Sequence, residues 1–521
     1  MNTTHKYLAH FIIEADVPFA IGSGERGFTV DQLIVRDALG LPYVPGSSLA
    51  GVLRHELDPM DELEEVKKLF GFQSKDDGQG SRINFSSAHL VGADGKTIVE
   101  GLQDVDLNSG YYGFFQKLPE RDHVRINDKG AVDGHGKFDE ELVHKGTRFA
   151  FNIELSGDES DRQDWQHVLS LIHQPLFRLG AGTRKGFGKL KVISCKTRVF
   201  DLNNKSDLLA YLAHSNSLNE SLTGWQEIRP EVALSDDWVH YKLNLTPENF
   251  FLFGAGYGDK DVDNKPKTER YFDWSSGKPV LAEKYWLLIP ATSVKGALSH
   301  RVAYRYNLIA GNFIGGTQQA PTSPPAADIS AIVASMTPPV DVDILNISSA
   351  SPEWEQLRKK IDAWTLEEAL SEADSWQHYE NELEKYKTNY KSAEKPVGDN
   401  PAVKALFGYA LDSDGTRVRG NVILSDLYLE PKEDAEKVFS HVAIDRFTGG
   451  ARDGMLFQQK AVSSDTFTLD IYVKKDALSD KNVRFAFEEA LLDLCNGDLQ
   501  LGGGSSKGHG IFKGSIEKTN A

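Results

Sequence analysis

The chain has 521 residues, of which 40% are hydrophobic and 26% are charged. A single hydrophobic core stops growing at about 250–300 residues, so more than one domain is expected. No stretch approaches the roughly 20 apolar residues of a membrane-spanning helix, and two cysteines, Cys195 and Cys495, exclude a disulfide scaffold or a cysteine-ligated metal site. The net charge is -18. A protein that binds nucleic acid unaided is expected to have a basic surface, and the net charge argues against one.

A long internal repeat organises the chain. Five blocks occur in the same order in both halves, at offsets between 232 and 337 residues. The clearest pairs are VPGSSLAGVL (44–53) with IPATSVKGAL (289–298), LFG (69–71) with LFG (406–408), and LGAGTRKGFG (179–188) with LGGGSSKGHG (501–510). Five matches in register predict two copies of one domain.

Each copy, without its insertions, is predicted as strand, glycine turn, helix, central strands, second helix and final strand. This βαββαβ order is typical of the ferredoxin-like fold, which RNA-recognition modules share. We predict an α+β chain with a first domain at 1–200, a connector at 201–236 and a second domain at 237–521 that carries an insertion at 303–402. The insertion is either a solvent-exposed segment without a partner or a docking surface for a neighbouring molecule, and the sequence leaves this open.

The Pro-Gly-Ser-Ser block is predicted to begin a helix. Ser47 or Ser48 is expected to cap it, and its apolar face would be Leu49, Val52 and Leu53. A helix start that offers amides and hydroxyl groups suits a phosphate, and Ser293 stands in the second copy. A plain helix cap explains the same residues equally well.

The two glycine-rich blocks follow a predicted helix and precede a strand. Rossmann and P-loop motifs have the opposite order, so neither nucleotide site is supported. Arg184, Lys185 and Lys507 in these loops, together with the glycine amides, favour contact with a polynucleotide backbone. A tight turn without a ligand is the competing interpretation.

Taken together, the blocks resemble the RAMP superfamily of CRISPR-associated proteins, in particular the repeated backbone subunit of type III effector complexes. DALGLPYVPGSSLAGVLR (37–54) is similar to the signature that follows the family's first strand, and IDRFTGGARDGMLF (444–457) is similar to its thumb hairpin. The glycine loops are similar to its terminal loop. Two such domains in one chain resemble the fused backbone subunits of type III-D systems.

The resemblance implies an antiviral ribonucleoprotein in the prokaryotic cytoplasm. Its implied partners are crRNA as the guide, a complementary target RNA, other RAMP backbone subunits and a large signalling subunit. In each domain a β-hairpin thumb would lie across the RNA. The residues implied to bind RNA are Ser47, Ser48, Arg54, His55, Gly180, Gly182, Arg184, Lys185, Gly186, Ser293, Lys295, His300, Arg301, Arg446, Arg452, Gly503, Lys507 and Gly508.

The resemblance also implies a metal-dependent endoribonuclease. In the family, an aspartate in the loop before the Pro-Gly-Ser helix supports cleavage of the target RNA, and here that position is Asp31. Asp31 would be both the catalytic residue and the ligand of Mg²⁺ or another divalent cation. Counting back in the same way from Asp273 lands on Lys267, with Asp261 and Asp263 nearby as candidates for a second site.

Two other functions fit the same blocks. A metal-independent endoribonuclease that processes crRNA would use a histidine as general acid or base, and His55 and His300 recur at equivalent positions. A non-catalytic crRNA-binding scaffold would need neither the histidines nor Asp31. The sequence leaves both alternatives open.

Overall fold

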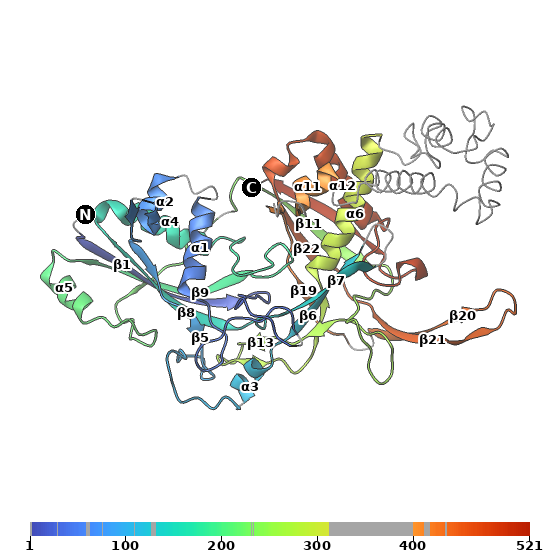
Figure 1. Ribbon diagram of the computed structural model, residues 1–521, viewed down its shortest axis with the longest axis horizontal. Helices are drawn as coiled ribbons and strands as arrows, with labels where there is room; N and C mark the ends of the chain where they lie inside the picture. The colour runs from blue at the N-terminus through green and yellow to red at the C-terminus, as the bar shows by residue number, and fades with distance from the viewer. Residues whose placement is uncertain are drawn as a thin grey trace, which may run out of the picture.

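The computed structural model describes two antiparallel sheets, each with helices on one face (Figure 1). The described residues are 3–28, 30–58, 63–75, 77–108, 110–126, 132–230, 232, 234–311, 400–410, 417–432 and 435–520. Each sheet belongs to one copy of the repeat, so the tandem α+β architecture expected from the sequence is confirmed.

The first sheet has the strand order β10-β9-β1-β8-β4, and β5 also pairs with β8. Numbered along the copy, its four main strands lie in the order 4-1-3-2, the ferredoxin-like arrangement. The strands are β1 (His5–Ala15), β4 (Ile83–Phe85), β5 (His89–Leu90), β8 (Arg148–Gly157), β9 (Leu190–Asp201) and β10 (Gln226–Glu227). Because β10 comes from the predicted connector 201–236, this segment extends the edge of the first sheet.

The helices of the first copy are α1 (Gly46–Leu57), α2 (Glu64–Phe70), α3 (Gly110–Gln116), α4 (Arg162–Ile172) and, in the connector, α5 (Lys205–Leu212). Strands β2 (Phe72–Gln73) and β3 (Gly78–Gln79) form a small ribbon after α2. Helices α1 and α4 pack together over the sheet.

The second sheet has the order β18-β22-β11-β23, which repeats the arrangement of the first. Its strands are β11 (Trp238–Pro247), β18 (Val422–Ile423), β22 (Phe467–Lys474) and β23 (Phe512–Asn520), and its helices are α6 (Ala291–Ile309), α11 (Pro401–Phe407) and α12 (Lys481–Asn496). Short strands complete this copy: β12 (Thr268–Glu269), β13 (Phe272–Asp273), β14 (Val280–Leu281), β15 (Trp286–Ile289), β16 (Gly408–Ala410), β17 (Arg417–Arg419) and β19 (Leu427–Leu429).

The predicted insertion, 303–402, begins inside helix α6. Helix α6 continues without a break to Ile309, and α11 begins at Pro401. Residues 312–399, which hold the remainder of the predicted insertion, lie outside the described residues.

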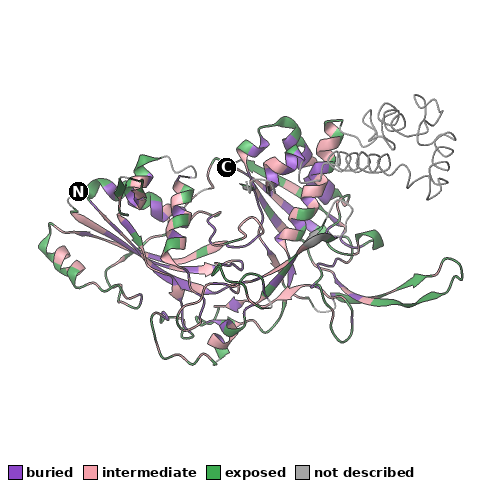
Figure 2. Ribbon diagram, viewed as in Figure 1, coloured by how far each residue is buried: buried purple, intermediate pink, exposed green. Residues whose placement is uncertain are grey.

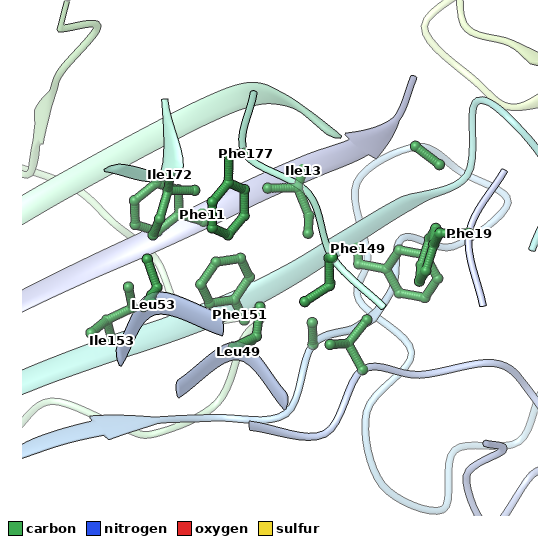
Figure 3. Close-up of a cluster of buried hydrophobic side chains, with 14 of the residues drawn as sticks. Phe11, Ile13, Phe19, Leu49, Leu53, Phe149, Phe151, Ile153, Ile172 and Phe177 are labelled. Carbon is green, nitrogen blue, oxygen red and sulfur yellow. The ribbon is translucent and has the colours of Figure 1, made fainter. Parts of the chain in front are cut away.

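Alternation along the strands builds the two cores. In β1, Phe11 and Ile13 point to the buried side, and the Phe11 ring stacks on Phe151 of β8 at 5.1 Å between ring centroids. Leu49 and Leu53, one turn apart on α1, close the core on the helix side of the sheet (Figure 3). Aromatic and branched residues at every second strand position therefore meet the apolar helix face that the sequence predicted at Leu49, Val52 and Leu53.

Each copy carries one long hairpin, which we call the first thumb and the second thumb. The first thumb consists of β6 (Glu120–Ile126) and β7 (Val132–Glu141), and the second of β20 (Glu436–Ile444) and β21 (Ala451–Val462). The first thumb lies against the second domain, whereas the second thumb projects away from the body (Figure 1) and is exposed over most of its length (Figure 2).

The two domains interlock. The ring of Phe272, from the second copy, is 2% exposed and lies in the first core, 5.1 Å from the Tyr111 ring centroid and 5.4 Å from that of Phe115. Beside it, the Trp274 indole donates a 2.6 Å hydrogen bond to the Gly146 carbonyl. This packing fixes the orientation of the first thumb over the second domain.

Candidate nucleic-acid interface

A groove of about 880 Å³ lies between the first thumb and the second domain; we call it the interdomain groove. The thumb side is formed by β6, with Arg121, His123, Val124 and Ile126. The opposite side is formed by the glycine turn 253–256, the first turns of α6, and Gly502 and Gly503 of the second glycine loop. Three of the repeated sequence blocks thus meet along one cavity.

Several residues that the sequence singled out line this groove. Ser293, His300 and Arg301 lie along α6, and Gly503 lies opposite the thumb. Part of the Arg301 charge is already used, because its Nε donates a 2.5 Å hydrogen bond to the buried carboxylate of Asp493. The thumb residues Arg121 and His123 were missed as site residues, although the His-Val pair at 123–124 recurs at 441–442 as one of the five repeated blocks.

The first glycine loop faces the second domain rather than open solvent. Arg184 Nε donates to the Gly420 carbonyl at 2.7 Å, and Lys295 Nζ donates to the Arg184 carbonyl at 3.3 Å. Burial, aided by neighbouring cations, lowers the pKa of Lys295 to about 8 and that of Arg184 to about 9. Gly186 is buried against Ala291. These predicted RNA contacts thus have an interdomain role.

The helix-cap prediction for Ser47 and Ser48 is wrong. Helix α1 follows Pro45, whose side chain cannot accept a hydrogen bond, and no side-chain cap is formed. The same holds for α6, which follows Pro290. The helices begin at Gly46 and Ala291, so Ser47, Ser48 and Ser293 lie within the first turn and cap neither helix.

The remaining predicted contacts lie apart from the groove. Arg54 donates a 3.0 Å hydrogen bond to the Gly71 carbonyl, and His55 is exposed on α1. Gly180 and Gly182 have φ of +87° and +68°, a conformation that glycine adopts at little cost. Gly508 and Lys507 lie exposed in the second glycine loop, and Arg446 and Arg452 are exposed at the tip of the second thumb.

Asp31 lies in an exposed loop at the base of the first thumb. Its amide donates to the Asp139 carboxylate at 2.7 Å, and the Asp139 amide donates to Asp31 Oδ2 at 3.2 Å. The reciprocal bonds bring two carboxylates together on the exposed side of the loop. Asp139, on β7, was not among the predicted site residues.

The counterpart of Asp31 in the second copy is Asp263. The backbone amide of Gln458 donates to Asp263 Oδ2 at 2.7 Å, just as the backbone amide of Asp139 donates to Asp31 Oδ2. The residues that follow, Gln32 and Asn264, form matching parallel bridges to β7 and β21. Lys267, the residue reached by counting back from Asp273, is the counterpart of Val35. The backbone amide of Lys267 donates to the Phe253 carbonyl, as that of Val35 donates to the Ile21 carbonyl. Asp261 lies in a turn with Asp259.

The carboxylates at Asp31 suit a divalent cation that also binds substrate. No group of three or more His, Cys, Asp or Glu side chains with metal-ligand spacing occurs among the described residues. Magnesium, however, is commonly held by one or two carboxylates together with water and substrate phosphates. Asp31 and Asp139 supply that donor set in the first copy, whereas Asp263 faces the neutral Gln458 in the second.

Comparison with known protein families gives one match. The family model of the RAMP superfamily matches residues 12–191 and 287–513. This chain belongs to the RAMP superfamily. The two matched stretches of this RAMP protein span most of both domains, which supports a CRISPR-associated, RNA-binding role.

Among curated proteins, none matches the sequence of this RAMP protein. Across the described part of the chain, every helix is too short or too polar to cross a membrane.

Proposed function

We propose that this RAMP protein is a backbone subunit of a type III CRISPR effector complex, which binds crRNA and cleaves complementary target RNA at Asp31 with a divalent cation. The interdomain groove carries the proposal, because it joins a thumb of one copy to the helix start, glycine turn and glycine loop of the other. A fused pair of domains would present to RNA the same junction that two adjacent backbone subunits form.

The groove suits a polynucleotide backbone better than a small cofactor. Cationic side chains, glycine segments and hydroxyl groups line it, and such groups recognise phosphate without reading sequence. Val124 and Ile126 of the thumb are 46% and 55% exposed and line the same space. Apolar side chains at this place would contact bases while the opposite side holds the backbone.

Asp31 is the proposed catalytic residue of the first domain. Together with Asp139 it would hold Mg²⁺, which when bound stabilises charge that develops on the scissile phosphate. The side chains themselves position the site, since the hydrogen bonds between Asp31 and Asp139 fix the loop on the base of the thumb. Asp263 would be a second, weaker site because Gln458 adds no charge.

The test is cleavage of labelled target RNA by the guide-loaded complex, in Mg²⁺ or EDTA. Asp31→Asn should remove one product with a rate loss of at least about 100-fold, the range seen when a group that stabilises transition-state charge is lost. Asp263→Asn is the matched comparison and should affect a different product. RNA binding should persist in both variants.

Other outcomes would point to the remaining functions. An unchanged product ladder in Asp31→Asn would reject this residue as catalytic and favour a scaffold. Cleavage that persists in EDTA and is lost in His300→Gln would instead favour a metal-independent endoribonuclease, since His300 lines the groove beside Arg301.

A further inference from the structure

The base of each thumb carries the same three side chains. In the first thumb His123 stacks on Phe138 at 4.8 Å between ring centroids, and Lys185 Nζ lies 4.4 Å from the Phe138 centroid. In the second thumb His441 lies 4.9 Å from Phe457, and Lys507 Nζ lies 4.3 Å from the Phe457 centroid. A histidine, a phenylalanine and a loop lysine are therefore placed alike in both copies.

The fourth position differs in charge. On β7 it is Glu140, opposite Arg121 in the ladder, and on β21 it is Gln459, opposite Phe439. Each also forms a parallel bridge: Glu140 pairs with Gln32, the residue after Asp31, and Gln459 pairs with Asn264, the residue after Asp263. The register thus identifies Gln459 as the neutral counterpart of Glu140.

In the first copy the acid neutralises its neighbours. Glu140 is 1% exposed, and its Oε1 lies 2.7 Å from His123 Nε2 and 3.1 Å from Lys185 Nζ. Its other oxygen is buried without a hydrogen-bond partner. This carboxylate supplies the negative charge internally and would repel a second anion.

His123 Nε2 also makes no hydrogen bond but lies beside the Glu140 carboxylate, whereas among the described residues the polar atoms of the second copy have no acid at ion-pair distance. Gln459 is 5% exposed and His509 6% exposed, yet Gln459 Nε2 and His509 Nδ1 make no hydrogen bond, and neither does the buried Nε2 of His441. A Cβ added to Gly504 would lie 3.5 Å from Gln459 Nε2 and 3.0 Å from His509 Cδ2, which places both side chains under the same loop as Lys507. Within the described ranges, no carboxylate lies at ion-pair distance from Lys507 Nζ.

Buried polar atoms without partners are costly, and native proteins rarely keep them without a ligand or water. We infer that the base of the second thumb is an anion site for an RNA backbone phosphate, formed by Lys507, His441 and the Gln459 amide. The phosphate supplies the negative charge that the Glu140 carboxylate supplies in the first copy. This inference rests on the RNA-binding role proposed above and adds an asymmetry between the copies.

An RNA phosphate fits this place better than a carboxylate of a partner protein. Lys507 belongs to the same glycine loop as Gly502 and Gly503, which line the interdomain groove. The loop has positive φ at Gly502, Gly504 and Gly508, and such turns direct successive amides toward an anion. A strand that follows the groove would therefore pass the base of the second thumb.

Two isosteric exchanges test the inference with the full chain in its guide-loaded complex and, separately, with a fluorescent single-stranded RNA. Gln459→Glu gives the second copy the acid of the first, and should weaken RNA binding several-fold and reduce the slope of log K against log salt by about one. Glu140→Gln makes the opposite change and should leave affinity equal to or above wild type. Gln226→Glu, exposed on β10, controls for the added charge alone.

A double-variant comparison links the effect to Lys507. In a Lys507→Met background, Gln459→Glu should cause no further loss of RNA affinity, because the lysine that binds the phosphate is already gone. Equal losses for Gln459→Glu and Gln226→Glu would overturn the inference. Unchanged RNA affinity with impaired assembly in Gln459→Glu would also overturn it and would indicate a protein carboxylate. Failure of the wild-type complex to bind RNA at all would instead refute the proposed function.

Discussion

Arg121 joins the domains through charges that are almost completely buried. Its guanidinium lies 2.6 Å from Glu269 and 2.7 Å from Asp426, both in the second domain. Burial alone would raise the pKa of Glu269, but the Arg121 charge, the Tyr428 hydrogen bond and the Lys267 charge together outweigh burial, and the pKa is lowered. For Asp426 burial outweighs the arginine and the pKa is raised. One arginine thus pairs with two buried acids of the second domain.

Arg121→Met should be strongly destabilising. The substitution leaves Glu269 and Asp426 buried without their cation, and breaking a buried ion pair on one side typically costs about 3–5 kcal/mol. We expect a lower urea midpoint for the first unfolding transition of the full chain. The triple variant Arg121→Met, Glu269→Gln, Asp426→Asn should recover most of this loss, since it leaves no uncompensated charge.

Arg229→Met is the matched control, because Arg229 pairs with Glu227 on the exposed connector. An exposed pair is worth about 0–1 kcal/mol, so its midpoint should stay close to that of wild type. If Arg121→Met unfolded like Arg229→Met, the buried pairs would not hold the domains together.

The glycine loops show how one element serves two purposes. The first loop is packed into the interface between the domains, and an added Cβ at Gly186 would lie 2.4 Å from the Ala291 Cβ. The second loop borders the groove, and an added Cβ at Gly508 would meet no atom within 4 Å. The same sequence pattern is therefore an interface in one copy and an open surface in the other.

Gly186→Ala and Gly508→Ala form a matched pair. Both glycines have positive φ, +108° and +83°, so each alanine should lose about 1–2 kcal/mol of conformational stability. Gly186→Ala should lose more, because its methyl group also collides with Ala291. Urea unfolding of the two variants measures the difference in their free energies of unfolding. Equal losses would show that the interface moves aside for the added methyl group without a loss of stability.

The elements could be predicted from the sequence because the repeat exposes them twice. Strand alternation, the Pro-Gly-Ser helix and the glycine loops all appear where the blocks placed them. The second acid could not be placed by counting. Asp263 follows Asp31 by 232 residues, whereas Ile289 follows Val44 by 245, so extra residues in the second copy shift any count made backwards from Asp273. Only the hydrogen-bond register identifies the counterpart.

The roles of the loop cations also lay beyond the sequence. Arg184 and Lys507 stand in equivalent glycine-rich blocks, and both have the composition of phosphate contacts. Which one faces solvent depends on how the domains interlock, and that follows from Phe272 entering the first core. Contacts between elements far apart in the chain leave no periodic signal in either of them.

At the scale of the whole molecule, the fused pair contains one complete junction and one unpaired thumb. The base of the first thumb is held against the second domain through Arg121, while the second thumb projects away from the body and its Val438, Ile444 and Phe447 are 47%, 57% and 99% exposed. The first junction could not simply be repeated between chains, because the ladder position of Arg121 is occupied by Phe439 in the second thumb. The internal junction is therefore the one whose stability can be tested in the isolated chain.

His144 should make that junction sensitive to acid. Its ring lies between the domains, 5.4 Å from the Phe272 ring centroid, and burial lowers its pKa from 6.5 to about 4. Nearby Glu269 acts to raise this pKa and Arg270 to lower it.

The folded chain keeps His144 neutral, whereas the unfolded chain takes up a proton below about pH 6.5. Stability is therefore complete above that pH and is lost progressively as the pH falls toward 4.

Acidification from pH 7.5 to 5 should cost about 2 kcal/mol through this histidine alone. His144→Gln cannot titrate, so its urea midpoint should fall less than that of wild type over the same range. His167→Gln, exposed on α4, should respond to pH like wild type, and His10 and His173, whose pKa burial also lowers, contribute equally in all three proteins. Parallel pH profiles for wild type and His144→Gln would show that the interface opens to water before this ring is protonated, and the junction would then be acid-sensitive for another reason.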